Sequence, residues 1–178
     1  MIRLIAHASI LFLVGLVQLS LLPTWPTPVM WVHLLLCAII FMTVLVSYQA
    51  GLWWAFVSGI LLELYSFLPF GVLLVSLLAT TVGVNFLFNH LFTNRSLYSL
   101  LLLGMFGTLA FNGFRWGLIW LLSVFGILSP SGLVRFVSQW QFLGWQIFLN
   151  SLVLLIVFII FRFFTRKLRT DLHLNQQF

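Results

Sequence analysis

Glu63 is the one residue of this 178-residue chain that places a carboxylate inside a long apolar stretch. The only other acidic residue, Asp171, lies in the polar segment near the C-terminus. An ionisable side chain in an apolar membrane segment is energetically costly, so it marks a candidate functional site whose partner has to be found. General acid–base catalysis needs positioned titratable groups, and this stretch offers a single carboxylate. The sequence therefore predicts a binding or structural role for Glu63, and it predicts that the chain is not an enzyme.

The fifth apolar stretch provides a candidate partner for this carboxylate. Gly104, Thr108, Asn112 and Arg115 follow one another at steps of four, four and three residues, which places them on one helical face. At about 1.5 Å per residue, Glu63 and Arg115 both fall in the outer half of their spans. We predict an ion pair between them. The alternative is that Arg115 extends outward to the lipid headgroups while Glu63 is protonated or lines a wet crevice.

A turn follows Glu63 and belongs to the same candidate site. Pro69 and Gly71 interrupt the apolar run six and eight residues after the acid, and they predict a turn that returns the chain into the membrane. Gly59 lies one helical turn before Glu63, and together with Gly51 it suggests a helix that crosses the membrane only with help from its neighbours, or a partial span buried against them. The predicted partner-binding or structural site therefore consists of Glu63, Arg115, Asn112, Pro69, Gly71 and Gly59.

The remaining polar residues indicate packing rather than cofactor chemistry. His33 and Cys37 are four residues apart and could supply two metal ligands, but neither an acidic residue nor a second cysteine accompanies them. We therefore expect no metal site. The sequence also lacks a glycine-rich phosphate loop and an HExxH motif, so we expect no cofactor. Gln139, Gln146 and Asn150 share one face around the start of the last apolar stretch, and we expect them to bond between helices.

The composition identifies the class of protein that holds these residues. Apolar residues make up 63% of the chain and charged residues 6%, and the mean hydropathy is +1.20. Such a chain cannot cover a soluble domain with polar surface, so it is an integral membrane protein. The net charge of +6 does not indicate a nucleic-acid partner, because five of the eight basic residues lie near the two ends of the chain.

Six stretches are apolar enough to cross or enter a bilayer, for which roughly 20 helical residues are needed. They cover residues 4–22, 29–48, 51–67, 71–92, 97–126 and 142–164. The predicted fold class is an all-α integral membrane protein, a six-helix bundle formed by residues 1–165. The third span is short and contains two glycines, so we expect it to be irregular. The fifth is long and must tilt, kink or project beyond the bilayer.

The basic residues predict the orientation of these spans. Six spans place both termini on one side, and that side receives all but one of the basic residues that lie outside the spans, so both termini are expected in the cytoplasm. Residues 166–178 are expected to form a basic tail beside the anionic headgroups of the bilayer. A short interfacial helix is predicted before the last span from the helical spacing of Leu133, Phe136, Val137 and Trp140.

The chain resembles the rod shape-determining MreD family. The resemblance is carried by the Gly-x-x-x-acid step from Gly59 to Glu63, by the turn FLPFG at residues 67–71, by the long fifth span and by the basic tail. It covers the whole chain in layout and residues 51–83 in motif. Glu63 stands where members of the family more often have aspartate.

This resemblance implies a non-catalytic subunit of the cell-wall elongation machinery in the bacterial inner membrane. The implied partners are an MreC-like periplasmic scaffold protein and the glycosyltransferase and transpeptidase complex that builds the lateral wall. The implied fold is similar to the substrate-binding subunits of energy-coupling-factor transporters, with an open face that docks the membrane helix of a partner. Glu63 and the turn at Pro69 would shape that face. The alternative function is a vitamin-binding subunit of such a transporter, which would need an outward pocket with several polar groups.

Overall fold

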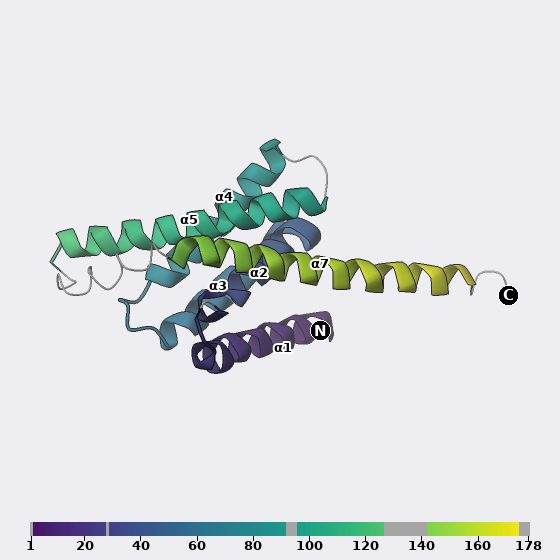
Figure 1. The fold of residues 1–178 in the computed structure, drawn as a ribbon, viewed down its shortest axis with the longest axis horizontal. Coiled ribbons are helices and arrows are strands. Elements are labelled where there is room, and N and C mark those ends of the chain that lie inside the picture. Colours follow the sequence, from purple (N-terminus) through teal and green to yellow (C-terminus); the bar gives the residue numbers. More distant parts are fainter. Residues whose placement is uncertain (1, 28, 92–95, 127–141, 175–178) are drawn as a thin grey trace.

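The computed structural model describes residues 2–27, 29–91, 96–126 and 142–174, and every regular element within these ranges is helical. Figure 1 shows the helices packed side by side, with α7 extending well beyond the others. The α-helices in these ranges are α1 (Ile2–Leu16), α2 (Leu34–Phe41), α3 (Tyr48–Leu64), α4 (Val72–Leu91), α5 (Leu97–Val124) and α7 (Leu143–Leu174). The predicted all-α class is confirmed for the described residues.

Three helices are long and apolar enough to cross a membrane, namely Val72–His90, Leu97–Val124 and Leu143–Phe163. They correspond to the fourth, fifth and sixth predicted spans. Two shorter apolar helices are Ser9–Thr24, which overlaps the first predicted span, and Leu34–Val46, which lies within the second. The third span is α3, which has 17 residues and is therefore short, as predicted. Its backbone is a regular helix, however, so the expected irregularity lies elsewhere.

The irregularities occur in the first two spans. A π-helical turn, η1 (Val17–Leu21), continues α1, and a second, η4 (Met42–Val46), continues α2. A π-turn contains an extra residue in one turn and changes the direction in which the side chains point. The two turns contain the buried polar residues Gln18 and Thr43. Gln18 also contacts the start of α2.

α2 lies at the centre of the bundle and packs against α1, α3, α4, α5 and α7. Leu35, Leu36, Ile39 and Ile40 on this helix are almost completely buried. All eight residues of α2 are apolar, which fits this position, because a helix that is apolar all round is normally enclosed by protein or lipid. Gly107 of α5 allows α2 to approach closely, since a methyl group at this position would lie 2.6 Å from the Cδ1 atom of Ile40.

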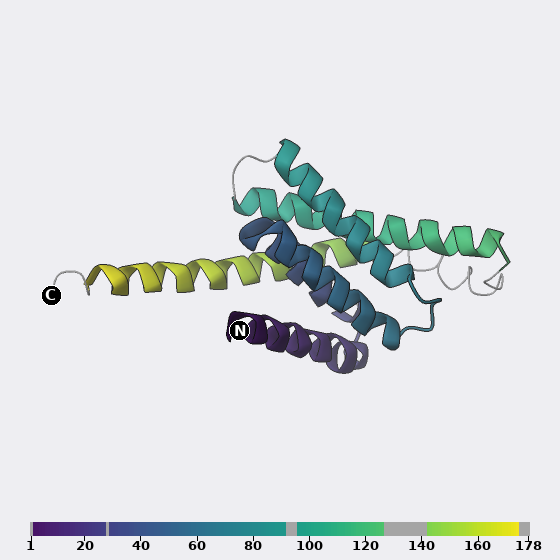
Figure 2. The ribbon, with the colours of Figure 1, turned by 180° about the vertical axis from the view of Figure 1, so that it is seen from behind.

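α5 and α7 extend past the bundle in opposite directions. Figures 1 and 2 show the C-terminal end of α5 and the turn between α3 and α4 toward one end of the molecule, and the C-terminal part of α7 toward the other. α7 continues to Leu174, so residues 166–174 of the predicted tail belong to this helix. No proline or glycine follows Gly144, and nothing in the sequence therefore stops the helix at residue 165. The interfacial helix predicted around residues 133–140 lies outside the described residues.

Candidate functional site

Glu63 lies in the last turn of α3 and bonds to the start of α4. Its Oε1 atom accepts a hydrogen bond from the backbone N–H of Gly71 at 2.7 Å and another from the N–H of Leu74 at 3.0 Å. The side chain is 7% exposed. Oε2 is buried and has no hydrogen-bond partner among the described residues. One carboxylate oxygen therefore connects two consecutive helices.

The sequence explains why this bond is needed. The carbonyl of Gly71 accepts the first intrahelical bond of α4, from the N–H of Val75 at 2.9 Å, so Gly71 occupies the N-cap position. A glycine has no side chain with which to satisfy the free N–H groups of the first turn. Glu63 performs this capping role from the preceding helix, and its negative charge lies at the favourable end of the α4 dipole. Gly71 itself has φ +104°, which residues other than glycine rarely adopt.

The predicted ion pair between Glu63 and Arg115 is not formed in the part of the chain that the structure describes. Oε1 of Glu63 is engaged by two backbone amides, and Oε2 accepts no bond. Arg115 instead donates from Nη2 to Oδ1 of Asn112 at 3.1 Å, and its guanidinium lies 5.7 Å from the centroid of the Phe111 ring. The helical-face reasoning placed Asn112 and Arg115 together correctly. The backbone N–H groups at the start of α4 bond to the carboxylate of Glu63 instead, which helical periodicity does not predict.

Gly59 performs the role expected of a small residue in α3. A methyl group added there would lie 2.8 Å from the Cα of Leu74, so the backbones of α3 and α4 are in close contact.

The turn that joins these helices has large apolar side chains on its outside. We call residues 64–71 the α3–α4 corner; its exposed apolar residues are Leu64, Tyr65, Phe67 and Phe70. Pro69 lies in the same turn, where its carbonyl is 3.4 Å from the N–H of Val72.

A second polar cluster connects four parts of the chain in the interior of the bundle. Asn150 of α7 donates from Nδ2 to the hydroxyl of Thr108 in α5 at 3.2 Å, and its Oδ1 accepts from the backbone N–H of His33 at 3.0 Å. Gln18 of η1 contacts Nδ1 of His33 at 3.3 Å and accepts from the N–H of Leu35 at 2.8 Å. These bonds satisfy the backbone N–H groups of His33 and Leu35 at the start of α2.

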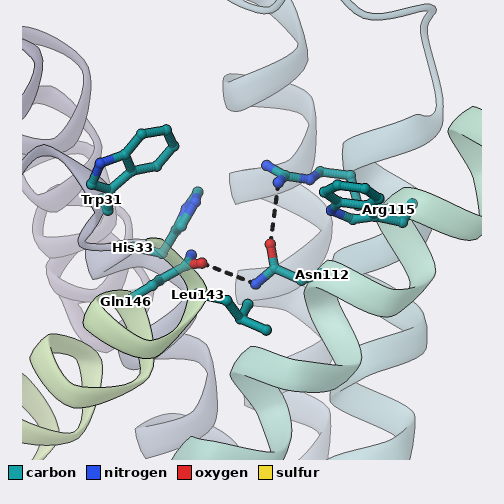
Figure 3. A pocket seen from close by; sticks show the side chains of 7 residues that line it. Trp31, His33, Asn112, Arg115, Leu143 and Gln146 are labelled. Atoms are coloured by element: carbon teal, nitrogen blue, oxygen red, sulfur yellow. Dashed lines mark hydrogen bonds between the residues drawn. The ribbon is translucent and has the colours of Figure 1, made fainter. Parts of the chain in front are cut away.

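Asn112 and Gln146 extend this cluster toward Arg115. Asn112 donates from Nδ2 to the carbonyl of Thr108 at 2.8 Å and to Oε1 of Gln146 at 3.1 Å. Figure 3 shows the chain of bonds from Gln146 through Asn112 to Arg115, with His33 and Trp31 on the opposite side. The interhelical bonds predicted for Gln146 and Asn150 are confirmed, whereas Gln139 lies outside the described residues.

These side chains enclose a small pocket between α5, α7 and the start of α2. Its volume is about 60 Å³, and it is lined by Trp31, His33, Asn112, Arg115, Trp116, Leu143 and Gln146. Sequence reasoning missed the contribution of Gln18 and His33. Part of the cluster could have been found in the sequence, because Gln146 and Asn150 are four residues apart, as are Thr108 and Asn112, so the two pairs can face one another across two helices. Nothing in the sequence indicated that the first span would contribute Gln18.

The comparison with known protein families supports the resemblance noted from the motif. The family described as rod shape-determining protein MreD matches residues 2–168. The chain belongs to the MreD family. No curated protein and no solved structure matches the chain. Membership of the MreD family indicates involvement in determining rod shape, and the apolar helices indicate a membrane protein. The MreD family is a family of shape-determining proteins. Within the described residues, no group of three or more His, Cys, Asp or Glu side chains could hold a metal ion.

Proposed function

We propose that this chain is a non-catalytic scaffold subunit of the cell-wall elongation machinery, and that its α3–α4 corner docks the membrane helix of an MreC-like partner. The main observation behind this proposal is that the exposed apolar side chains of the corner lie on a turn whose backbone is fixed by the buried side chain of Glu63. Leu64, Tyr65, Phe67 and Phe70 face outward, while Glu63 fixes the turn from behind through two hydrogen bonds. Exposed apolar groups on a fixed backbone can bind a partner with little loss of conformational entropy.

The proposed location is the bacterial inner membrane with both termini in the cytoplasm. The α3–α4 corner and the pocket beside Arg115 would then lie on the periplasmic side, where an MreC-like scaffold is anchored. The glycosyltransferase and transpeptidase of lateral wall synthesis are proposed as further members of the complex. The distribution of basic residues supports this orientation, because Arg162, Arg166, Lys167 and Arg169 all lie toward the C-terminal end of α7.

The polar pocket beside Arg115 is too small for a vitamin, and the larger pocket of about 550 Å³, between the start of α5 and α7, is lined mainly by apolar and aromatic side chains. This combination favours a scaffold over a vitamin-binding transporter subunit. Pockets for drug-sized ligands measure roughly 300–1,000 Å³, whereas the pocket beside Arg115 measures about 60 Å³. A vitamin would need the surrounding helices to move apart. The polar side chains of this cluster are also bonded to one another across α5 and α7, which holds these helices together.

Co-purification tests the proposal. The tagged chain is expressed with an MreC-like protein in a rod-shaped bacterium, extracted in mild detergent and isolated by affinity. We expect the partner to be retained by the wild-type chain and lost with a Phe67→Ala, Phe70→Ala double variant. Phe12→Ala is the matched control, because Phe12 is an exposed phenylalanine on α1. Equal retention of the partner by both variants would contradict docking at the α3–α4 corner. Co-purification of a stoichiometric vitamin or of an ATPase module in place of the partner would contradict the scaffold function.

A further inference from the structure

The larger pocket lies at the end of the bundle from which α7 projects. It is enclosed by the end of η4, the start of α5 and the middle of α7. Figure 1 shows the start of α5 and the C-terminal part of α7 toward this same end of the molecule. The pocket volume of about 550 Å³ falls within the roughly 300–1,000 Å³ that is usual for small-molecule sites.

The wall of this pocket is apolar inside and polar at its exposed edge. Leu45, Leu97 and Phe158 line it and are partly buried, and the first and last of them pack against the core of the bundle. Tyr98 and Arg162 also line it, but both are exposed. Among the described residues that line the pocket, none is acidic. A ligand that matches this wall is apolar along most of its length and negatively charged at one end.

The pocket also lies at the depth where the hydrocarbon of a bilayer meets the headgroups. The part of α7 that can cross a membrane ends at Phe163, and that of α5 begins at Leu97. Arg162 and Tyr98 are next to these two limits. Tyrosine is enriched at the membrane–water interface, and an arginine at this depth keeps its stem along hydrocarbon and its charge among the headgroups. The apolar interior of the pocket is therefore within reach of an acyl chain.

We infer that this pocket binds one acyl chain of an anionic phospholipid, and that Arg162 binds the phosphate of the same lipid. A guanidinium suits this group because it can donate two parallel hydrogen bonds to a phosphate. Arg162 is followed along the chain by Arg166, Lys167 and Arg169, and a basic cluster beside a membrane span attracts anionic lipids. The inference does not depend on the docking corner, which lies on α3 and α4.

Lipid titration of the purified, full-length protein tests this inference. The protein is stripped of co-purified lipid in detergent and titrated with phosphatidylglycerol or with phosphatidylcholine of the same acyl chains, and the bound lipid is measured by native mass spectrometry. We expect saturable binding, with phosphatidylglycerol bound about fivefold more tightly, the factor that one basic residue near the headgroups provides. Arg162→Gln should abolish this preference, whereas Arg162→Lys should retain it because the charge remains.

Leu97→Trp tests the apolar part of the pocket without changing any charge. The larger side chain would occupy space needed by the acyl chain, so the affinity for both lipids should fall by about tenfold or more, as expected when two methylene groups are excluded. Leu102→Trp is the matched control, because Leu102 is an exposed leucine of α5 that does not line the pocket. Its affinities should equal those of the wild type.

Three results would overturn the inference. The first is equal affinity of the wild type for the two lipids, and the second is equal weakening by Leu97→Trp and Leu102→Trp. The third is a loss of affinity for phosphatidylglycerol in Arg162→Gln with none in Leu97→Trp, which would indicate attraction by surface charge alone. If Leu97→Trp does not give a monodisperse protein, Leu97→Phe makes a smaller change in the same direction, and its affinities are compared with those of Leu102→Phe.

Discussion

The carboxylate of Glu63 and the backbone N–H of Gly71 are joined by a hydrogen bond of 2.7 Å, between residues eight positions apart in the chain. The same oxygen accepts from Leu74. An acid that the sequence presents as a costly anomaly in an apolar segment is thus the N-terminal cap of the following helix. This arrangement explains both the burial of Glu63 and the need for glycine at residue 71.

Removing the acceptor from Glu63 should destabilise the turn between α3 and α4. We expect Glu63→Leu to lower the free energy of unfolding by about 1–2 kcal/mol, the amount usually lost with a helix cap. Glu63→Gln keeps an oxygen acceptor of the same length and should lose less than half as much. Denaturant unfolding in detergent, followed by tryptophan fluorescence, measures both changes. A glutamine variant as unstable as the leucine variant would show that charge, rather than the acceptor, is what the site requires.

Glu63 and Arg115 should contribute independently to stability. The carboxylate bonds to the start of α4, and Arg115 bonds to Asn112. In a double-mutant cycle with Glu63→Gln and Arg115→Gln, the free energies of unfolding should therefore add to within about 0.5 kcal/mol. A coupling energy above about 1 kcal/mol would contradict this expectation and support the ion pair that was predicted from the sequence.

The positive φ angle of Gly71 makes an alanine there unfavourable. At φ +104° a Cβ atom causes backbone strain, and we expect Gly71→Ala to lower the free energy of unfolding by about 1–2 kcal/mol. Gly113→Ala is the control, because Gly113 lies within α5 and an added methyl group meets nothing within 4 Å. That substitution should be neutral or stabilise by up to about 1 kcal/mol. The two variants would be compared by thermal unfolding, and an equal loss in both would contradict this interpretation of the turn.

Gly59 should tolerate no side chain, because α4 lies against it. The added methyl group of Gly59→Ala would lie 2.8 Å from the Cα atom of Leu74, which is backbone and cannot rotate away. We expect a loss of about 1–3 kcal/mol, typical of overpacking. Gly83→Ala is matched to it, since its nearest neighbour would be Phe106 at 3.9 Å. A melting temperature of Gly59→Ala equal to that of Gly83→Ala would show that α3 and α4 are not in close contact.

Much of the helical layout could be predicted from the sequence, because long apolar runs bounded by proline, glycine and charged residues determine it locally. The length of α5 and the shortness of α3 are examples. The last span was predicted to end at residue 164, and the part of α7 that is apolar enough to cross a membrane ends at Phe163. The helix itself continues to Leu174, because the polar segment that follows contains good helix formers. Whether residues are exposed to water or lipid does not decide whether they form a helix.

Sequence reasoning identified several of the buried polar residues but not the bonds that they form. Helical periodicity placed Asn112 beside Arg115, and it indicated that Gln146 and Asn150 would bond between helices. Periodicity cannot show which backbone amides a turn leaves unsatisfied, so the capping role of Glu63 was missed. The π-turn that buries Gln18 was equally invisible, since it depends on tertiary contacts with α2.

Site-specific photo-crosslinking in living cells tests the proposed docking corner most directly. A photoreactive amino acid replaces Phe67 in the α3–α4 corner or, as the control, Phe12 on α1, and the products are identified by mass spectrometry. We predict crosslinks from residue 67 to the membrane helix of an MreC-like protein and few or none from residue 12. Crosslinks of equal yield from both positions, or a partner captured from residue 12 alone, would contradict the proposal that this MreD-family chain docks its partner at the corner that Glu63 supports.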